Sequence, residues 1–497
     1  MSNKLTTRTL IITAIFICFS AVSFSSEGIL KFDKVQSNQY IVSVSEEDPL
    51  RANVKAKIHM QGDTLVMSGN CPNYDYPEGW ATFIGSLKIN DAKGDPVSFK
   101  YATKSKWVLS SGLESPVTVR YTVDLSFVNV PWDVGNEQAG YSDGESVYLV
   151  SKALFMFDEG ADTSSEVIFD LPSSWKLATA WTSQPNEGNR FLIPNNESLI
   201  ENSLVYGNFS MHRFTEGAFS FTIALPGEAG KDAPLISPAL SKIARAYMRI
   251  FDKTPPTAYL ITMFYARLDD GESFLTSMAF TLQDKVGEHN KIIWANQMAH
   301  ELFHYWNSDL MEATDYGERQ WFSEGTAEYY ANMTLVREGI ISESMFENKI
   351  EKVLGLYMNY RGWREGETSM LKAGEDKGVH RFLVYNGGWA TAMALDTLIM
   401  EHSDGKKNLD DFFRLMFERF RTSPYSYEDI IQTASEVCGK DLTEFFSKYV
   451  SGTELIPLET YFLKLGYSMA DIIYEGELYL TRLPHNPKDL NALWLRN

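Results

Sequence analysis

The stretch AHELFHYW (299–306) contains residue types at a spacing that could bind a metal ion. His300 and His304 stand four positions apart, so on a helix they share one face and can direct imidazole nitrogens at the same zinc ion. Glu301 is rotated around the helix axis, where it can take a proton from a zinc-activated water instead of binding the ion. The competing interpretation is a surface helix that carries two solvated histidines.

A second stretch, WFSEGTAEYY (321–330), supplies the carboxylates that such a site needs. A catalytic zinc site takes three protein ligands and keeps a fourth position open, and Glu324 can be the third ligand. Glu328 lies one helical turn later and can accept the remaining ring N–H of a ligand histidine, which would fix its tautomer. Spacing, apolar flanks and helical context agree, which disfavours two ordinary solvated helix acids. We therefore predict one zinc ion held by His300, His304 and Glu324.

The elements that must position these residues change in kind along the chain. Alternating apolar and polar residues, as in 54–60 and 117–125, predict strands from about residue 30 to 230. Near residue 235 the period becomes helical, with Ser237 expected to cap a helix that has Pro238 at its first position. Two strand-like runs follow, 258–266 and 273–282. Asn290 is expected to cap a helix through Trp306, and the remainder is mainly helical.

These motifs resemble the gluzincin metallopeptidases, specifically the glycyl aminopeptidase family. The resemblance rests on HELFHYWN followed by WFSEGTAEYYA, and extends to DLPSSWKLATAW (170–181), VYNGGWATAMALD (384–396) and YVSGTELIPLETYFLKLGY (449–467). It implies that His300, His304 and Glu324 bind zinc and that Glu301 is the general base. It also implies that Tyr385 donates to the oxyanion, a role that stabilises charge present only in the transition state.

The resemblance also implies the architecture. We expect an α+β multidomain protein, in which an N-terminal antiparallel β-sandwich-like domain precedes a thermolysin-like catalytic domain with a helical C-terminal part. The expected boundaries are a signal peptide at 1–23, the β domain at 27–230, the catalytic domain at 231–400, the helical region at 401–466 and a tail at 467–497. That tail is too short for the PDZ module that relatives often carry.

The chain departs from the family pattern at two places. Gly387 stands where the family usually has a lysine. More importantly, relatives bind the substrate's free amine through a glutamate in a glycine-rich strand, and the corresponding residues 276–279 contain no acid. Glu272 is nearby in sequence, but the sequence gives no geometric reason to assign it that role. His380 is a further polar candidate, although a lone histidine is more often structural.

The composition and the first residues limit the cellular compartments and the binding partners that can be expected. At 497 residues the chain should form two or three domains, and its formal net charge of −20 argues against nucleic acid or anionic lipid as a partner. A basic start, an apolar run and a small-residue cleavage pattern predict a secretory signal, so we expect a periplasmic or extracellular protein without stable membrane insertion after cleavage. Cys71 and Cys438 are far apart, and we predict no disulfide between them.

Taken together, the sequence predicts an exported, zinc-dependent, aminopeptidase-like hydrolase acting on peptide or protein substrates. Because no amine-binding acid is found in 276–279, an endopeptidase or a hydrolase of a non-peptide amide or epoxide on the same scaffold stays an alternative. Two alternatives without catalysis are a zinc-containing peptide-binding protein and a β-rich carbohydrate-binding protein. Glu301, which no structural zinc site requires, argues against both.

Overall fold

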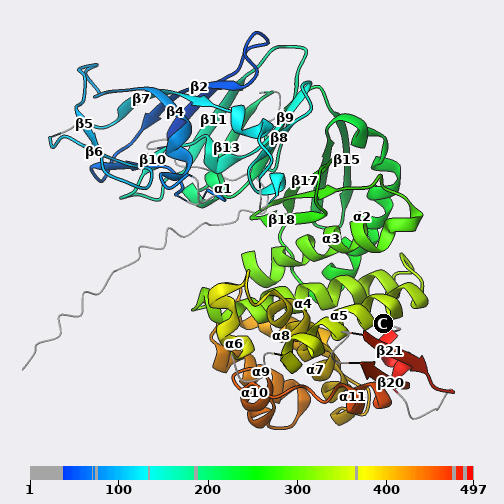
Figure 1. Ribbon diagram of the computed structural model, residues 1–497. Coiled ribbons are helices and arrows are strands. Elements are labelled where there is room, and N and C mark those ends of the chain that lie inside the picture. The colour runs from blue at the N-terminus through cyan, green and yellow to red at the C-terminus, as the bar shows by residue number, and fades with distance from the viewer. Residues whose placement is uncertain are drawn as a thin grey trace, which may run out of the picture.

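The computed structural model describes residues 37–495 except 70, 73–75, 113, 133–134, 184–187, 364–367, 473–476 and 485–489. Three parts follow one another along the chain (Figure 1): a sheet-rich N-terminal domain, a five-stranded sheet with two helices, and a bundle of helices that ends in a small hairpin. This mixed α+β, multidomain architecture confirms the predicted fold class. The expected signal peptide, residues 1–23, lies outside the described residues. No described helix is long and apolar enough to cross a membrane.

The N-terminal domain is built from three sheets around one apolar core. Its inward side chains alternate with exposed ones, as in the fully alternating strand β2, which is the pattern of a sheet with one solvated face. One pair, β1 with β11, is parallel, whereas the other pairs in these three sheets are antiparallel. The sheets are β13-β11-β1-β2-β7-β4, β10-β3-β6-β5 and β12-β14-β9-β8, and their strands are β1 (Asn38–Ser43), β2 (Arg51–Ile58), β3 (Thr64–Val66), β4 (Ile84–Asn90), β5 (Phe99–Tyr101), β6 (Lys106–Leu109), β7 (Val117–Asp124), β8 (Gly140–Ser142), β9 (Ser146–Val150), β10 (Phe157–Asp158), β11 (Ser165–Asp170), β12 (Lys176–Thr179), β13 (Arg190–Ile193) and β14 (Ser203–Gly207), with the short helix α1 (Asn196–Ile200) before β14.

The next sheet positions the candidate site and begins earlier than the sequence indicates. Its order is β15-β16-β17-β19-β18, from β15 (Ser210–Glu216), β16 (Phe219–Leu225), β17 (Thr257–Tyr265), β19 (Ser277–Leu282) and β18 (Asp270–Phe274). The strands β15 and β16 were expected in the first domain, which was placed at 27–230. They pair instead with β17, so the sheet boundary falls near residue 208. Alternating patterns predict strands but do not say which sheet a strand joins.

The run 273–282, expected as one strand, contains the end of the first strand, the turn and the second strand of a hairpin. The antiparallel partners β18 and β19 are joined through Leu275 and Thr276. Every residue of β19 is buried, whereas β18 is the outer strand of the sheet. One face of the sheet packs on the N-terminal core through Phe264 and Ala279, and the other packs on helices through Met278 and Phe280. The free edge next to the helices is therefore β18.

Two helices cover the inner face of this sheet: α2 (Ala233–Ile250) and α3 (Lys291–His304). The helix α2 begins four residues before the predicted cap, with Asp232 at its N-cap position, so Pro238 lies inside the helix and not at its start. The helix α3 begins after Asn290 as expected. Its regular part ends at His304, and a π-helical turn, Tyr305–Asp309, carries it past the predicted end at Trp306.

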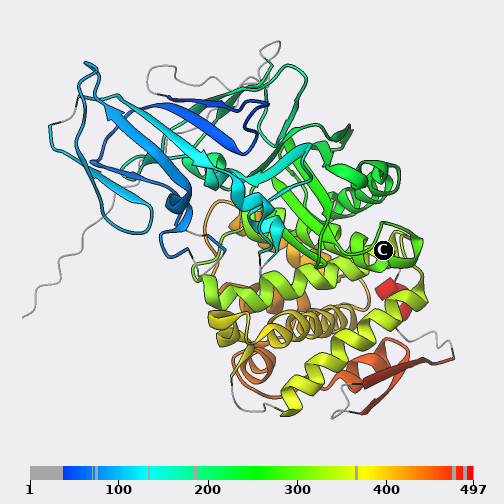
Figure 2. The ribbon, with the colours of Figure 1, turned by 45° about the horizontal axis from the view of Figure 1, so that its top comes forward.

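The helical part begins with the long helix α4, which lies beside α3 in both ribbon views (Figures 1 and 2). The elements are α4 (Tyr316–Arg337), α5 (Glu343–Trp363), α6 (Met370–Ala373), a π-helical turn Phe382–Gly387, α7 (Gly388–His402), α8 (Leu409–Phe420), α9 (Tyr427–Cys438), α10 (Thr443–Tyr449), α11 (Leu458–Lys464), the hairpin β20 (Tyr467–Ile472) and β21 (Glu477–Arg482), and α12 (Asn491–Leu495). As predicted, Ser426 caps α9, and its hydroxyl accepts a hydrogen bond from the Asp429 amide. Trp494 attaches the C-terminal tail to α4, because its Nε1–H donates a hydrogen bond to the Tyr329 hydroxyl at 2.9 Å.

The helices α4 and α7 touch through two glycines, and this contact fixes the helix that carries Glu324. A Cβ added at Gly325 would lie 2.3 Å from the Cα atom of Gly388 and 2.9 Å from the backbone nitrogen of Trp389. Those are backbone atoms, so neither helix can yield by rotating a side chain. We predict that Gly325→Ala lowers the free energy of unfolding by about 2 kcal/mol and weakens zinc binding, measured by thermal denaturation and metal titration. Gly378→Ala is the control: a Cβ there would lie 4.0 Å from Asp376 Oδ1, an ordinary contact, so this variant should unfold like the unmodified protein.

Candidate active site

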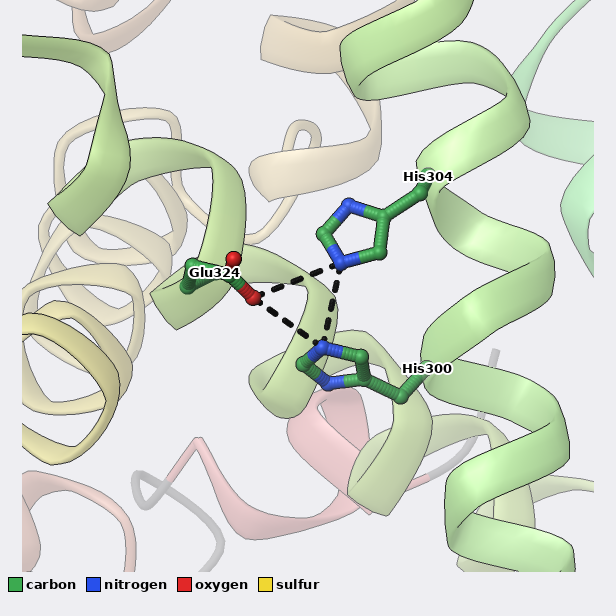
Figure 3. Close-up of side chains that lie close together, drawn as sticks. All are labelled: His300, His304 and Glu324. Atoms are coloured by element: carbon green, nitrogen blue, oxygen red, sulfur yellow. Dashed lines mark hydrogen bonds and ion pairs between the residues drawn. The ribbon is translucent and has the colours of Figure 1, made fainter. Parts of the chain in front are cut away.

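The predicted metal ligands come together from two neighbouring helices (Figure 3). The Nε2 atoms of His300 and His304 lie 3.1 Å apart, and Glu324 Oε2 lies 3.2 Å from the first and 3.4 Å from the second. A tetrahedral zinc ion with bonds of about 2.0–2.1 Å separates its ligand atoms by about 3.3 Å. The two imidazoles and the carboxylate therefore fit a zinc ion in both donor type and spacing.

Partners behind the two histidines fix their ring orientations. Glu328 Oε2 lies 3.3 Å from His300 Nδ1, the position that the sequence predicts for it. On His304 the same role falls to Asn307, whose Oδ1 lies 3.1 Å from His304 Nδ1. The amide group of Asn307 is itself fixed, because its Nδ2 donates to the Ser323 carbonyl at 2.8 Å. Both histidines can then present Nε2 to a metal, because an oxygen acceptor lies beside the Nδ1 atom of each ring. Sequence reasoning missed Asn307.

The third ligand, Glu324, is held by a lysine that the sequence did not indicate. Lys377 Nζ donates to Glu324 Oε1 at 2.8 Å, which leaves Oε2 facing the histidines. Burial alone would raise the pKa of Glu324, but hydrogen bonds with His300 and His304, together with the charge of Lys377, hold it well below its usual range. A permanently ionised carboxylate is the form that binds a metal ion.

Glu301 lies beneath the edge strand β18. A Cβ added at Gly271 would lie 2.7 Å from Glu301 Oε1, so only glycine lets the strand pass this close. Burial raises the pKa of Glu301 to about 8, against the smaller opposing effect of His300. A divalent cation bound by the neighbouring histidines would lower that pKa, because an opposite charge favours the ionised form. Glu301 therefore lies beside the candidate metal site, and its role as proton acceptor stays a prediction.

Tyr385 faces the histidines from the π-helical turn Phe382–Gly387. Its ring is stacked at 6.1 Å from the ring of His300, at an interplanar angle of 19°. Burial and the charge of Glu324 raise its pKa well above the usual range, so the phenol keeps its proton and stays a donor. Its hydroxyl forms no hydrogen bond with a described residue and is available to a ligand. His380, the other candidate, lies 2.6 Å through Nδ1 from the Tyr360 hydroxyl and does not line the cavity.

Acidic side chains of β18 form the wall that sequence reasoning did not find. The expected segment 276–279 lies inside the structure: Thr276 donates to Asn202 Oδ1 at 2.9 Å, and Met278 and Ala279 are fully buried. Asp270 and Glu272, four or more residues earlier, line the cavity instead. The correction follows from the hairpin, which places the exposed edge at 270–274.

The two acids of β18 have pKa values above the usual range for carboxyl groups. Burial raises the pKa of Glu272 to about 7 and also raises the pKa of Asp270. Glu137, from the N-terminal domain, lies behind them and is fully buried, with Oε1 making no hydrogen bond to a described residue. A concentration of carboxylates at one end of a cleft is a site for a cation.

Glu137 should make stability depend on pH in a defined direction. Burial, followed by the charges of Asp270 and Glu272, raises its pKa to about 8. Because this folded-state pKa lies above the unfolded value, the stabilising contribution is complete below about pH 4.5 and is lost as the pH rises toward 8. We predict that Glu137→Gln, which cannot ionise, raises the free energy of unfolding by about 3 kcal/mol at pH 8 and much less at pH 5. Denaturant unfolding at both pH values measures this difference, and an equal change at both would contradict it.

The predicted metal ligands, Glu301, Tyr385 and the two acids of β18 line one cavity of about 820 Å³ between the edge of the sheet and the helices. Its walls include Asp270 and Glu272 from β18, His300, Glu301 and His304 from α3, and Glu324 from α4. Volumes of this order accommodate a small ligand or a short peptide. The candidate zinc ligands, the buried Glu301 carboxyl, the Tyr385 phenol and the acids of β18 thus face one space.

Comparison with known proteins agrees with this site. Residues 37–208 match the family described as the peptidase M61 N-terminal domain, and residues 294–377 match the M61 glycyl aminopeptidase domain. The fold is similar to an aminopeptidase N family protein from Idiomarina loihiensis, with a TM-score of 0.75 at 20% identity over 87% of this chain and 79% of that one. It is also similar to an M1 zinc metallopeptidase mutant from Deinococcus radiodurans bound to a Tyr-Ser-Ala substrate, with a TM-score of 0.54 at 14% identity over 85% and 95%. No curated protein matched the sequence.

The fold and the site therefore define a zinc aminopeptidase-like hydrolase. Both family matches are to M61 domains, and together they span just over half of the chain. The chain thus matches two domain models of the M61 glycyl aminopeptidase family, as the motifs around His300 and Glu324 predicted.

Proposed function

We propose that this protein is a zinc-dependent aminopeptidase that removes single residues from peptides with a free N-terminus. The observation that carries the proposal is the acidic wall of Asp270 and Glu272, which lines the same cavity as the metal ligands and Glu301. A carboxylate pair at one end of the cleft can hold the protonated amine and place the first peptide bond over the metal site. An endopeptidase would have no use for such a wall. The similar M1 enzyme with a bound peptide supports a peptide substrate.

The catalytic roles follow from what each residue faces. Zinc, held by His300, His304 and Glu324 as one ion, would polarise the scissile carbonyl and acidify a water molecule. Glu301 accepts a proton from the attacking water and delivers it to the leaving nitrogen, so its carboxyl acts first as base and then as acid. The Tyr385 hydroxyl donates a hydrogen bond to the oxygen that gains negative charge.

The supporting groups keep the ligands in place. Glu328 and Asn307 orient the two imidazoles, and Lys377 holds Glu324 so that one oxygen faces the metal. These contacts contribute to metal affinity without touching the substrate.

The amine-binding role of β18 gives a specific test. Loss of a charge-assisted hydrogen bond to a substrate cation costs a few kcal/mol, so we predict that Glu272→Gln lowers kcat/KM by about 100-fold for peptides with a free N-terminus. The measurement is mass spectrometry of the products from matched peptides, free and N-terminally acetylated. Glu166→Gln, at a carboxylate in the N-terminal domain away from the cavity, is the control and should match the unmodified enzyme.

Two results would overturn the proposal. Internal cleavage that ignores acetylation would identify an endopeptidase. Equal kcat/KM values for the Glu272→Gln and unmodified proteins would remove β18 from amine recognition.

We also propose that the protein is exported. The support is the basic start, the apolar run and the small-residue pattern in residues 1–23. N-terminal sequencing of the protein recovered outside the cytoplasm tests this, and an intact N-terminus on a protein retained in the cytoplasm would contradict it.

A further inference from the structure

The helical wall of the cavity carries positive charge, although the whole chain has a net charge of −20. Two of its lysines are already paired: Lys349 lies 3.1 Å from Glu328 Oε1, and Lys377 donates to Glu324. Of the three remaining cations, Arg319 on α4 is only partly exposed, and the carbon of its guanidinium group lies 5.0 Å from the centre of the Tyr316 ring. Lys352 on α5 and Arg381 before the π-helical turn form no ion pair with a described residue. Both are exposed and line the cavity. They are therefore available to an anionic group of a ligand.

Arg381 is held close to the reacting centre. The carbon of its guanidinium group lies 4.7 Å from the centre of the Tyr385 ring, a cation–π arrangement that fixes the side chain over the proposed oxyanion donor. An extended chain advances about 3.3–3.6 Å per residue. A carboxylate one or two residues beyond the scissile bond is therefore within reach of Arg381. The guanidinium plane suits two parallel hydrogen bonds to a carboxylate.

The same wall exposes large apolar side chains. Ile293 is 40% exposed, Leu356 is 40% exposed and Phe382 is 39% exposed, and all three line the cavity. Ile293 lies two helical turns before His300 on α3, so this apolar group extends the cleft along that helix. Exposed apolar side chains gathered in one concave surface indicate a binding site for an apolar group.

The sheet wall and the helical wall of the cleft thus have opposite character. The carboxylates of β18, with Glu137 behind them, belong to the sheet and the N-terminal domain. The free cations and the apolar side chains belong to the helical part and α3. A peptide bound with its amine at the acidic wall can place its remaining residues against the cationic and apolar side chains of the helical wall.

We propose that the preferred substrates are peptides of two or three residues with a free carboxylate and an apolar residue after the scissile bond. This substrate class rests on the aminopeptidase function proposed above. The carboxylate pairs with Arg381 and Lys352, and the apolar side chain packs against Ile293, Leu356 and Phe382. The cavity of about 820 Å³ suits a ligand of this size.

The test compares the tripeptide Gly-Leu-Ala with its C-terminal amide and with Gly-Ser-Ala. For the zinc-loaded enzyme we expect kcat/KM for the free acid to exceed that for the amide by about tenfold, equivalent to 1.4 kcal/mol, and to exceed that for the serine peptide. The double variant Arg381→Gln/Lys352→Gln should bring the acid-to-amide ratio close to one. Arg381→Lys, which keeps the charge but not the planar fork, should give an intermediate ratio. Lys372→Gln changes an exposed lysine outside the cavity and should keep the original ratio.

The outcomes separate this proposal from the function on which it rests. If glycine is released equally fast from the acid and the amide, the carboxylate preference is wrong and the aminopeptidase function stands. A ratio that persists in the double variant would remove Arg381 and Lys352 from recognition and overturn the assignment. If no peptide releases glycine, and the Glu301→Gln variant behaves identically, the proposed function itself fails.

Discussion

Replacing Glu301 with glutamine is expected to lower kcat by a factor of roughly 10² to 10⁴ while zinc content stays unchanged. Glutamine keeps the shape of the side chain, which matters because Glu301 lies directly beneath Gly271 of β18. It cannot accept a proton from the attacking water. The zinc ligands His300, His304 and Glu324 are untouched, so metal binding should persist. Steady-state kinetics with a glycyl peptide and metal analysis of the same preparation measure both quantities.

The control for this substitution is Glu288→Gln, at an exposed carboxylate before the start of α3. It lies outside the cavity and should leave kcat unchanged. Near-full turnover by the Glu301→Gln variant would show that another group accepts the proton. Loss of zinc along with activity would make Glu301 part of the metal site, contrary to its assigned role.

Replacing Tyr385 with phenylalanine is expected to lower kcat by roughly 10² to 10³, with little change in KM. The ring remains stacked beside His300, and only the hydroxyl that donates to the developing oxyanion is lost. Because that charge exists only in the transition state, the substitution should affect turnover more than substrate binding. Separate determination of kcat and KM at saturating zinc distinguishes the effect on turnover from the effect on substrate binding.

Tyr360→Phe offers a matched control. Tyr360 lies in the same region, next to His380, but does not line the cavity. This variant should retain most of the activity. A rise in KM with unchanged kcat in the Tyr385→Phe variant would assign the hydroxyl to ground-state binding instead of oxyanion stabilisation.

The local part of the site could be predicted from the sequence because helical spacing is a local rule. His300, His304 and Glu301 lie within one turn of α3, and Glu324 and Glu328 lie within one turn of α4. A four-residue separation on a helix fixes the relative direction of two side chains whatever the rest of the fold does. The structure brings His300 and Glu328 within 3.3 Å, as that rule and the zinc hypothesis together required.

The rest of the site depends on tertiary contacts that spacing does not encode. Lys377 reaches Glu324 from a segment 53 residues later in the chain. Asn307 contacts His304 only because a π-helical turn follows α3, and no simple sequence signal distinguishes that turn from a continued α-helix. Glu272 could not be assigned from the sequence, because the sequence does not show that the chain turns at Leu275 and Thr276 and leaves 270–274 as an edge strand. The stretch Asp269-Asp270-Gly271 could have indicated this edge, because it is polar and contains a glycine, as exposed edges and turns often do.

The most direct test of the central claim is zinc titration of the metal-free protein while the release of N-terminal residues is followed. A chelator removes the metal, and zinc is then added in measured fractions to the protein in the presence of a glycyl peptide. Activity should be absent without zinc, rise in proportion to the zinc added, and level off at one ion per chain. Peptide cleavage by the metal-free protein, or no cleavage after one ion has bound, would contradict the zinc aminopeptidase that His300, His304, Glu324 and Glu301 define.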